Sequence, residues 1–326
     1  MFSIQNGSIL NRSAASQIVL LERPKPMFRR GNRIQNGVEL TRQSWAALRA
    51  NPQLLIFPVI SLIGMIIVTI LFFIPVSATG IFSMLSEQNG RSSGNINNTL
   101  FTIVLFLYYF VTYTVIIFSN TALVGAALKL ARGETATVQD GINIALSRMG
   151  KIFVYALISA TIGMLARAVR QSGSNSRNIV GMIIANIIAG IIQGAWNLVV
   201  FFAIPVLVVE DLGVMDSLKR SLGLFKQTWG EQFTGSMAIS AVSCLVTLAL
   251  MVVGFVLITL AVATQSAVVI GLAIAIVVLA FIFLSLISGA INGIFQASLY
   301  QYATTGDAGK LIDTQLARNA FTPSVN

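Results

Sequence analysis

The longest stretch without a charged residue decides the fold: residues 232–306 read QFTGSMAISAVSCLVTLALMVVGFVLITLAVATQSAVVIGLAIAIVVLAFIFLSLISGAINGIFQASLYQYATTG. A helix that crosses the hydrocarbon core of a membrane needs about 20 predominantly apolar residues. The stretch is therefore long enough for two such helices, and the polar residues near 263–266 mark the turn between them. We predict a transmembrane hairpin here.

Four further charge-free intervals precede it, at residues 50–86, 92–128, 152–166 and 178–209. The third is short, but the long stems of Lys151 and Arg167 reach the membrane surface from inside a span. We therefore predict an all-α polytopic membrane bundle of six transmembrane helices. Pro205 is expected to kink or end the fourth helix, because proline has no backbone N–H to donate.

The composition excludes a soluble protein and several kinds of chemistry. Of 326 residues, 56% are hydrophobic and 10% are charged, with a mean hydropathy of +0.83, whereas soluble proteins carry about 25% charged residues. Histidine is absent and Cys244 is the single cysteine, which excludes histidine-based catalysis, an internal disulfide and cysteine-cluster metal sites. No acidic residue lies within a predicted span, which disfavours proton-coupled transport. We expect no enzyme activity, no cofactor and no metal.

Glu210 and Asp211, with Asp216 nearby, form the densest group of carboxylates. One interpretation is a Mg²⁺ or lipid-headgroup site, because oxygen ligands suit both. The other is a helix end followed by a capping acid. The sequence leaves these two interpretations open.

The basic residues predict the orientation. With six spans and both termini in the cytoplasm, seventeen of the 21 Lys and Arg residues fall on the cytoplasmic side, as the positive-inside rule requires. We expect a multi-pass protein of the plasma (inner) membrane. The net charge of +10 then favours anionic lipids as partners, with other membrane subunits or a second copy as further partners and no nucleic acid.

A short pattern recurs three times before the predicted hairpins. The stretches 36–39, 137–140 and 213–216 each place an acid three positions after a residue suited to an N-cap. Five residues after each acid stands a small residue: Ser44, Ala145 or Ser221. We predict three amphipathic interfacial helices, and copies at about 33–132, 133–211 and 212–305 related by a pseudo-threefold axis. Residues 1–26 are expected to form a disordered tail, 27–305 the membrane domain, and 306–326 a cytoplasmic tail.

Three groups of side chains are candidates for function or packing. A polar seam inside the membrane is predicted from amides that share helix faces: Asn120, Asn186, Gln193, Asn197, Asn292 and Gln296. Small residues four apart favour close helix packing: Gly181, Ala185, Ala189, Ser285, Gly289, Gly293 and Ala297. Basic and aromatic residues are expected to face lipid at the interface: Arg29, Arg30, Trp45, Lys219, Arg220 and Trp229.

Several motifs stand out along the chain: Phe28-Arg29-Arg30-Gly31 leading to Ser44-Trp45, the run 122–128 with Arg132-Gly133-Glu134, 138–141 with 147–151, 205–210, 217–221 and 228–231. Together they resemble an uncharacterised family of bacterial six-helix membrane proteins. The resemblance covers about residues 27–305. The family is in turn more remotely similar to the membrane domain that precedes the catalytic domain of some bacterial glycerophosphodiesterases. The resemblance implies a six-helix membrane architecture and does not imply phosphodiesterase activity.

Two functions from different classes fit the sequence. The first is a non-catalytic membrane scaffold or accessory subunit that organises lipid or a membrane complex. The second is a passive or lipid-linked transporter or channel that uses the polar seam. Direct pairing of the amides across helices favours the first, because such pairs hold helices together. A water-filled cavity lined by Asn120, Asn197 and Asn292 favours the second.

Overall fold

Six long apolar helical stretches dominate the computed structural model, which describes residues 33–78, 95–174, 179–229 and 234–314. Within these ranges every regular element is a helix. The long helices are α3 (Ile56–Ala78), α5 (Asn95–Ala131), α7 (Met149–Ser174), α8 (Ile179–Val200), α11 (Thr234–Ala263) and α12 (Ala267–Thr305). Each stretch is long and apolar enough to cross a membrane, so the prediction of an all-α polytopic bundle is confirmed.

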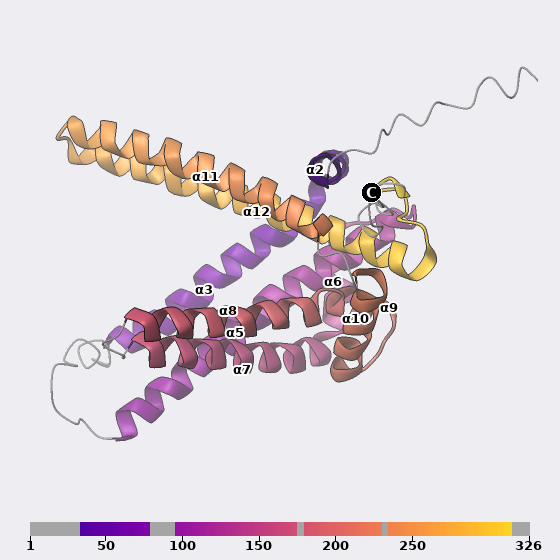
Figure 1. The fold of residues 1–326 in the computed structure, drawn as a ribbon, viewed down its shortest axis with the longest axis horizontal. Helices are drawn as coiled ribbons and strands as arrows, with labels where there is room; N and C mark the ends of the chain where they lie inside the picture. The colour runs from indigo at the N-terminus through magenta and orange to yellow at the C-terminus, as the bar shows by residue number, and fades with distance from the viewer. Residues whose placement is uncertain (1–32, 79–94, 175–178, 230–233, 315–326) are drawn as a thin grey trace, which may run out of the picture.

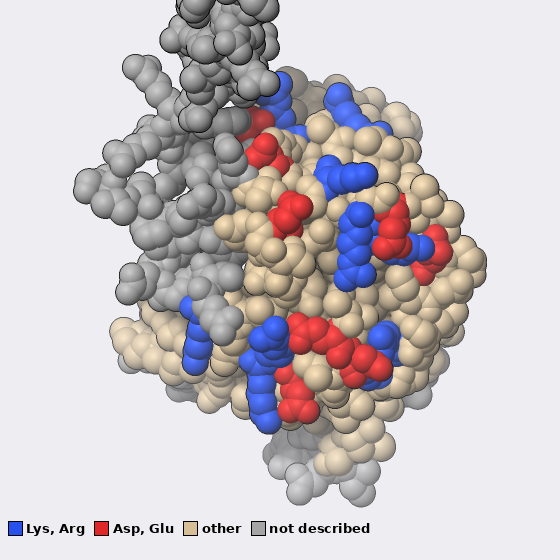
Figure 2. Space-filling model, turned by 90° about the vertical axis from the view of Figure 1, so that its right-hand side faces the viewer, with Lys and Arg blue, Asp and Glu red and all other residues tan. Residues whose placement is uncertain are grey.

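The shorter helices lie together at one end of the bundle (Figure 1). They are α2 (Arg33–Ala50), the 3₁₀ turn η1 (Pro52–Leu55), α6 (Val138–Ser147), α9 (Ala203–Val209) and α10 (Val214–Trp229). Lysine, arginine, aspartate and glutamate side chains gather on the face of the molecule at this end (Figure 2). We call it the charged end.

Each of α2, α6 and α10 precedes one of the hairpins α3–α5, α7–α8 and α11–α12. α6 packs against α5, α10 packs against α8 and α9, and α2 packs against α11 and α12. The small residues that recur in the sequence, Ser44, Ala145 and Ser221, are all 0% exposed. Equivalent small residues therefore mark the buried contact of all three short helices.

The α11–α12 hairpin diverges from the other helices as it leaves the charged end (Figure 1). The predicted turn is confirmed: α11 ends at Ala263, α12 begins at Ala267, and Gln265 has a φ of 54°. Large apolar side chains such as Leu245, Phe255 and Phe283 are more than 60% exposed. Such exposure is stable in lipid, which supplies the apolar surroundings that these side chains need.

The fourth span is broken, because α8 ends at Val200 and α9 begins at Ala203. We expected one helix over 178–209 with a kink or an end at Pro205. Pro205 has no N–H for the carbonyl of Phe201 four residues earlier, and the Gln296 side chain of α12 donates to that carbonyl instead. The Phe202 N–H donates to Ser221 Oγ of α10 at 2.9 Å. Both backbone groups at the break are thus satisfied by other helices.

Candidate functional site at the charged end

The end of α5 is fixed by a left-handed glycine. Gly133 has a φ of +83°, and the N–H groups of Gly133 and Glu134 donate to the carbonyls of Leu130 and Lys129 at 2.9 and 3.0 Å. This pair of bonds is a Schellman motif, which needs a left-handed residue after the helix. It places the side chain of Arg132 at the rim of the charged end.

Residues 306–314 fold back across the end of α5 and the side of α2, and we call them the C-terminal strap. The Lys310 N–H donates to Ala131 O at 2.9 Å, and the Asp313 N–H donates to Gln43 Oε1 at 2.9 Å. A Cβ on Gly309 would lie 2.3 Å from Ala131 O, and its φ is +79°. Only glycine allows this approach.

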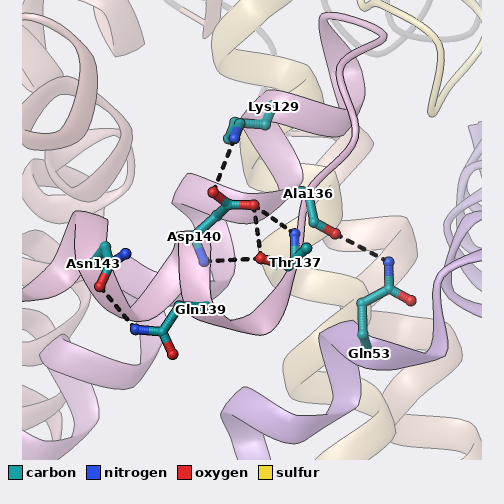
Figure 3. A network of polar contacts seen from close by, with 7 residues as sticks. All are labelled: Gln53, Lys129, Ala136, Thr137, Gln139, Asp140 and Asn143. Atoms are coloured by element: carbon teal, nitrogen blue, oxygen red, sulfur yellow. Dashed lines mark hydrogen bonds and ion pairs between the residues drawn. The ribbon is translucent and has the colours of Figure 1, made fainter.

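The turn from α5 into α6 is held by a network around Asp140 (Figure 3). Thr137 and Asp140 form a capping box, in which Asp140 N–H donates to Thr137 Oγ1 at 3.2 Å and Thr137 N–H donates to Asp140 Oδ2 at 2.8 Å. Lys129 Nζ lies 3.2 Å from Asp140 Oδ1, and Gln53 Nε2 donates to Ala136 O at 3.4 Å. The backbone and side-chain hydrogen bonds from Thr137, followed by Lys129, lower the pKa of Asp140 to about 2.

Glu210 joins three helices at the end of α9. Arg220 Nε of α10 donates to both carboxylate oxygens, at 3.2 and 3.1 Å. The Tyr300 hydroxyl of α12 donates to Oε1 at 3.0 Å. The carboxylate thus acts as a joint between α9, α10 and α12.

Asp211 joins α9 to the start of α7. Its Oδ1 pairs with Arg148 and with Lys151, the latter at 2.5 Å. Asp216, the third carboxylate of the group, pairs instead with Lys219 at 3.5 Å. In the described part of the chain no three acidic or cysteine side chains are close enough to hold a metal ion. The arrangement favours ion-paired helix ends as the interpretation of Glu210 and Asp211.

Two open hollows adjoin each other among these groups. The α12 hollow, of about 350 Å³, lies between α5, α9, α10 and α12, and the α6 hollow, of about 230 Å³, lies between α5, α6 and α9. They share Leu128, Arg132 and Val209. The α12 hollow adds Glu210, Arg220, Tyr300, Gln301, Thr304 and Thr305, and the α6 hollow adds Gly125, Lys129, Ile144, Ser147, Arg148 and Val208.

The six amides predicted to form a seam differ in their surroundings. Asn120, Asn186, Asn197 and Asn292 are exposed, and the inward orientation of their helix faces stays a prediction. Asn186 donates to its own helix at Met182 O, and Gln193 donates to Asn197 Oδ1 one turn away. The faces stay open because α12 diverges from the other helices (Figure 1). Among the described residues, Gln296 is the member of the six whose side chain forms a hydrogen bond to another helical segment, at Phe201 O.

The predicted small residues lie mostly at helix contacts. On α8, Ala185 and Ala189 are buried, and a Cβ on Gly173 of α7 would lie 2.1 Å from Ala185 Cβ and 3.1 Å from Gly181 O. On α12, a Cβ on Gly293 would lie 2.4 Å from Leu123 of α5. The remaining members vary: Ala297 is buried, Gly289 faces Pro58, and Ser285 is exposed.

The predicted lipid-facing residues divide into three groups. Arg29, Arg30 and the Trp229 side chain lie outside the described residues. Trp45 is half-buried against the core, with Arg49 stacked 5.0 Å above its ring, and Lys219 is exposed beside Asp216. Arg220 differs from the expectation, because its guanidinium binds Glu210 and is not free to extend toward lipid.

Sequence reasoning missed two residues that line the α12 hollow, Tyr300 and Gln301. They lie far in the sequence from the other lining residues, and no spacing pattern links them. Arg132 and Arg148 did carry a signal, since they stand in the Arg132-Gly133-Glu134 motif and the 147–151 motif, and the structure places Gly133 of the first in a left-handed turn.

No curated protein matches the chain. A family described as one of unknown function (DUF6159) matches residues 99–310, which include most of α5, all of α6 to α12, both hollows and residues 306–310 of the strap. The chain, a multi-pass helical membrane protein by its six apolar helices, therefore belongs to this family of unknown function.

Proposed function

We propose that the protein is a non-catalytic scaffold of the bacterial inner membrane, whose charged end faces the cytoplasm and organises anionic lipid, alone or within a membrane complex. The orientation follows from the excess of Lys and Arg at this end. The proposal includes the absence of enzymatic activity.

The observation that carries the proposal is the set of ion pairs at the charged end. Glu210, Asp211 and Asp140 each bind a lysine or arginine from another helix, and together they join α5, α6, α7, α9 and α10 or their flanking turns. The Tyr300 hydroxyl adds α12 to the same set through Glu210. Carboxylates held in this way serve as joints and are poor general acids or bases for catalysis. The result is a rigid basic surface at the level where spans end, which suits attraction of anionic headgroups.

The proposed pseudo-threefold repeat supports a scaffold. The second span of each hairpin, which includes α9 in the second hairpin, ends near a residue in the left-handed region: Gly133, Asp211 and Gly306, with φ of 83°, 50° and 79°. Each short helix packs on the second helix of the preceding hairpin, and α2 closes the ring on α12. A closed ring of like units presents three similar interfacial helices to the membrane surface.

The resemblance to the membrane domain of glycerophosphodiesterases, which rests on the sequence motifs alone, is compatible with the same proposal. The fold alone does not carry an activity, so no phosphodiesterase activity is proposed for this chain.

Purification in a mild detergent, followed by mass spectrometry of the co-purified lipids and proteins, tests the scaffold. We expect anionic lipid enriched over its share of the source membrane. Lipid bound in bulk proportions, together with no retained protein, contradicts the proposal. A single cysteine introduced between residues 129 and 140 into a Cys244→Ser background tests the orientation, because it should be labelled only after the cells are permeabilised.

The alternative function is a passive or lipid-linked transporter. One observation favours it: Asn120, Asn197 and Asn292 stand 13, 14 and 14 residues before the left-handed residues Gly133, Asp211 and Gly306. Equivalent amides on three second helices would ring a path along the pseudo-threefold axis. Solute flux into proteoliposomes that is abolished by Asn197→Leu and Asn292→Leu, without loss of folded protein, would establish this alternative in place of the scaffold.

A further inference from the structure

The two hollows at the charged end differ in what their walls offer. The α6 hollow presents the side chains of Lys129, Arg132 and Arg148, and no carboxylate is among its wall residues. The α12 hollow presents the side chains of Glu210 and Gln301, which carry hydrogen-bond acceptors, beside Arg220. One hollow therefore suits an anion, and the other suits groups that donate hydrogen bonds.

Arg132 lies in the wall that both hollows share. Lys129 and Arg148 of the α6 hollow pair with Asp140 and Asp211, but Arg132 takes part in none of the ion pairs among the described residues. A guanidinium with its donors available at a fixed helix end is suited to bidentate contact with a phosphate group. The Schellman turn at Gly133 holds its backbone in place.

Gln301 supplies the complementary feature in the α12 hollow. Its Oε1 is buried and has no hydrogen-bond partner in the structure. A buried acceptor without a donor destabilises the protein, and a ligand hydroxyl that reaches this oxygen from the hollow would satisfy it. The α12 hollow therefore suits a ligand group that donates a hydrogen bond, and the neighbouring Arg132 suits an anionic group of the same ligand.

The hollows also lie where a lipid headgroup lies. Their shared wall stands at the ends of two apolar spans, Thr99–Ala131 and Ile179–Val209, and the α12 hollow reaches the end of a third, Ala267–Thr305. The shared residues Leu128 and Val209 give both hollows an apolar side. A ligand with a phosphate, free hydroxyls and an apolar portion matches this combination.

We propose that the two hollows form one site for a phosphate ester that carries free hydroxyls, with the phosphate at Arg132 in the α6 hollow and a hydroxyl donating to Gln301 in the α12 hollow. The ligand chemistry is shared by a polyol-phosphate lipid headgroup and by a water-soluble polyol phosphate. The proposal deepens the scaffold function, on which it rests for the lipid as the natural source.

The test is titration of delipidated protein in detergent, read by native mass spectrometry as bound lipid. The probes are phosphatidylglycerol, phosphatidic acid, which lacks the hydroxyls, and zwitterionic phosphatidylcholine, with soluble glycerol phosphate as competitor. We expect phosphatidylglycerol to bind most tightly, and Arg132→Gln to weaken it about tenfold, as loss of a charge-assisted contact does. Arg42→Gln, which removes the same charge from a side chain 80% exposed on α2, is the matched control and should change binding less than about twofold.

Further variants separate the two halves of the site. Gln301→Leu should reduce binding of phosphatidylglycerol to the level of phosphatidic acid and leave phosphatidic acid unchanged. Arg132→Lys, which keeps the charge, should restore part of the affinity, and thermal unfolding establishes that each variant is folded. Equal loss in Arg132→Gln and Arg42→Gln overturns the site.

The competitor decides the source of the ligand. Displacement of lipid by glycerol phosphate at similar concentration, dependent on Arg132, supports the site and assigns it to a soluble phosphate. Resistance to displacement assigns it to lipid. Failure of the scaffold function is seen separately, when the wild-type protein co-purifies with lipid in bulk proportions or carries a solute flux. The difference in lipid affinity between Arg132→Gln and Arg42→Gln can still be measured in that case.

Discussion

The side chain of Gln296 donates a hydrogen bond to the carbonyl of Phe201, the group that Pro205 leaves without its helical donor. The bond joins α12 to the break between α8 and α9, two segments 95 positions apart in the sequence. Together with the Tyr300–Glu210 hydrogen bond, it fastens the diverging third hairpin to the second.

Gln296→Leu should therefore lower stability. The carbonyl of Phe201 loses its donor in apolar surroundings, and we expect a loss of about 1–2 kcal/mol, seen as a lower midpoint of thermal unfolding in detergent. Asn292→Leu, one turn earlier on the same helix and exposed, is the control and should leave the midpoint nearly unchanged. Equal midpoints for the two variants would show that the bond contributes nothing.

Gly309→Ala should release the C-terminal strap from the end of α5. The added Cβ would lie 2.3 Å from Ala131 O, so the strap must move. Gly306→Ala is a close control, because Gly306 has the same φ of +79° and nothing within 4 Å of the added atom. Hydrogen exchange of the Lys310 amide should quicken in Gly309→Ala well beyond its value in Gly306→Ala. Similar rates in both variants would assign the effect to backbone strain alone.

The pKa of Asp140, lowered to about 2 by its bonds to Thr137 and Lys129, gives a pH dependence with a definite sign. The folded protein holds this carboxylate charged more strongly than the unfolded chain, whose pKa is near 3.8. The stabilisation is thus complete above about pH 4 and is lost as the pH falls through 2. The difference in unfolding midpoint between wild type and Asp140→Asn should be constant from pH 7 to about pH 5 and shrink below pH 4. A difference that grows on acidification would contradict the assignment.

Close packing of α7 and α8 predicts a strong effect at Gly173. Its added Cβ would lie 2.1 Å from Ala185 Cβ and 3.1 Å from Gly181 O, so Gly173→Val must push the hairpin apart, at a cost of about 1–3 kcal/mol for overpacking. Gly190→Val on α8, with nothing within 4 Å of an added Cβ, should be tolerated. Unfolding midpoints in detergent compare the two, and an equal loss in both would show that valine itself, and not the contact, is responsible.

The sequence predicted the spans because one physical rule governs them. A stretch such as residues 232–306 must form helices in lipid, whatever surrounds it, and the turn before Ala267 followed from the polar residues there. Pro205 likewise indicated an interruption, because its missing N–H is a local property.

The site was less predictable, since it depends on which helix ends meet. Glu210 was recognised as a candidate, but its partners Arg220 and Tyr300 lie 10 and 90 residues away, and no spacing rule links them. The exposed position of Asn292 was missed for a similar reason. The divergence of α12 is a property of tertiary packing and leaves no pattern in the sequence.

The strap places a constraint on the order of events during synthesis. Asp313 binds Gln43 across 270 positions, and Lys310 binds Ala131. The ribosome therefore delivers α2 and α5 to the membrane long before the residues that fasten them have been translated. Until then α2 has no third hairpin to pack against. The first hairpin is therefore inserted in the membrane without its final packing contacts until the last segment of the chain has been synthesised.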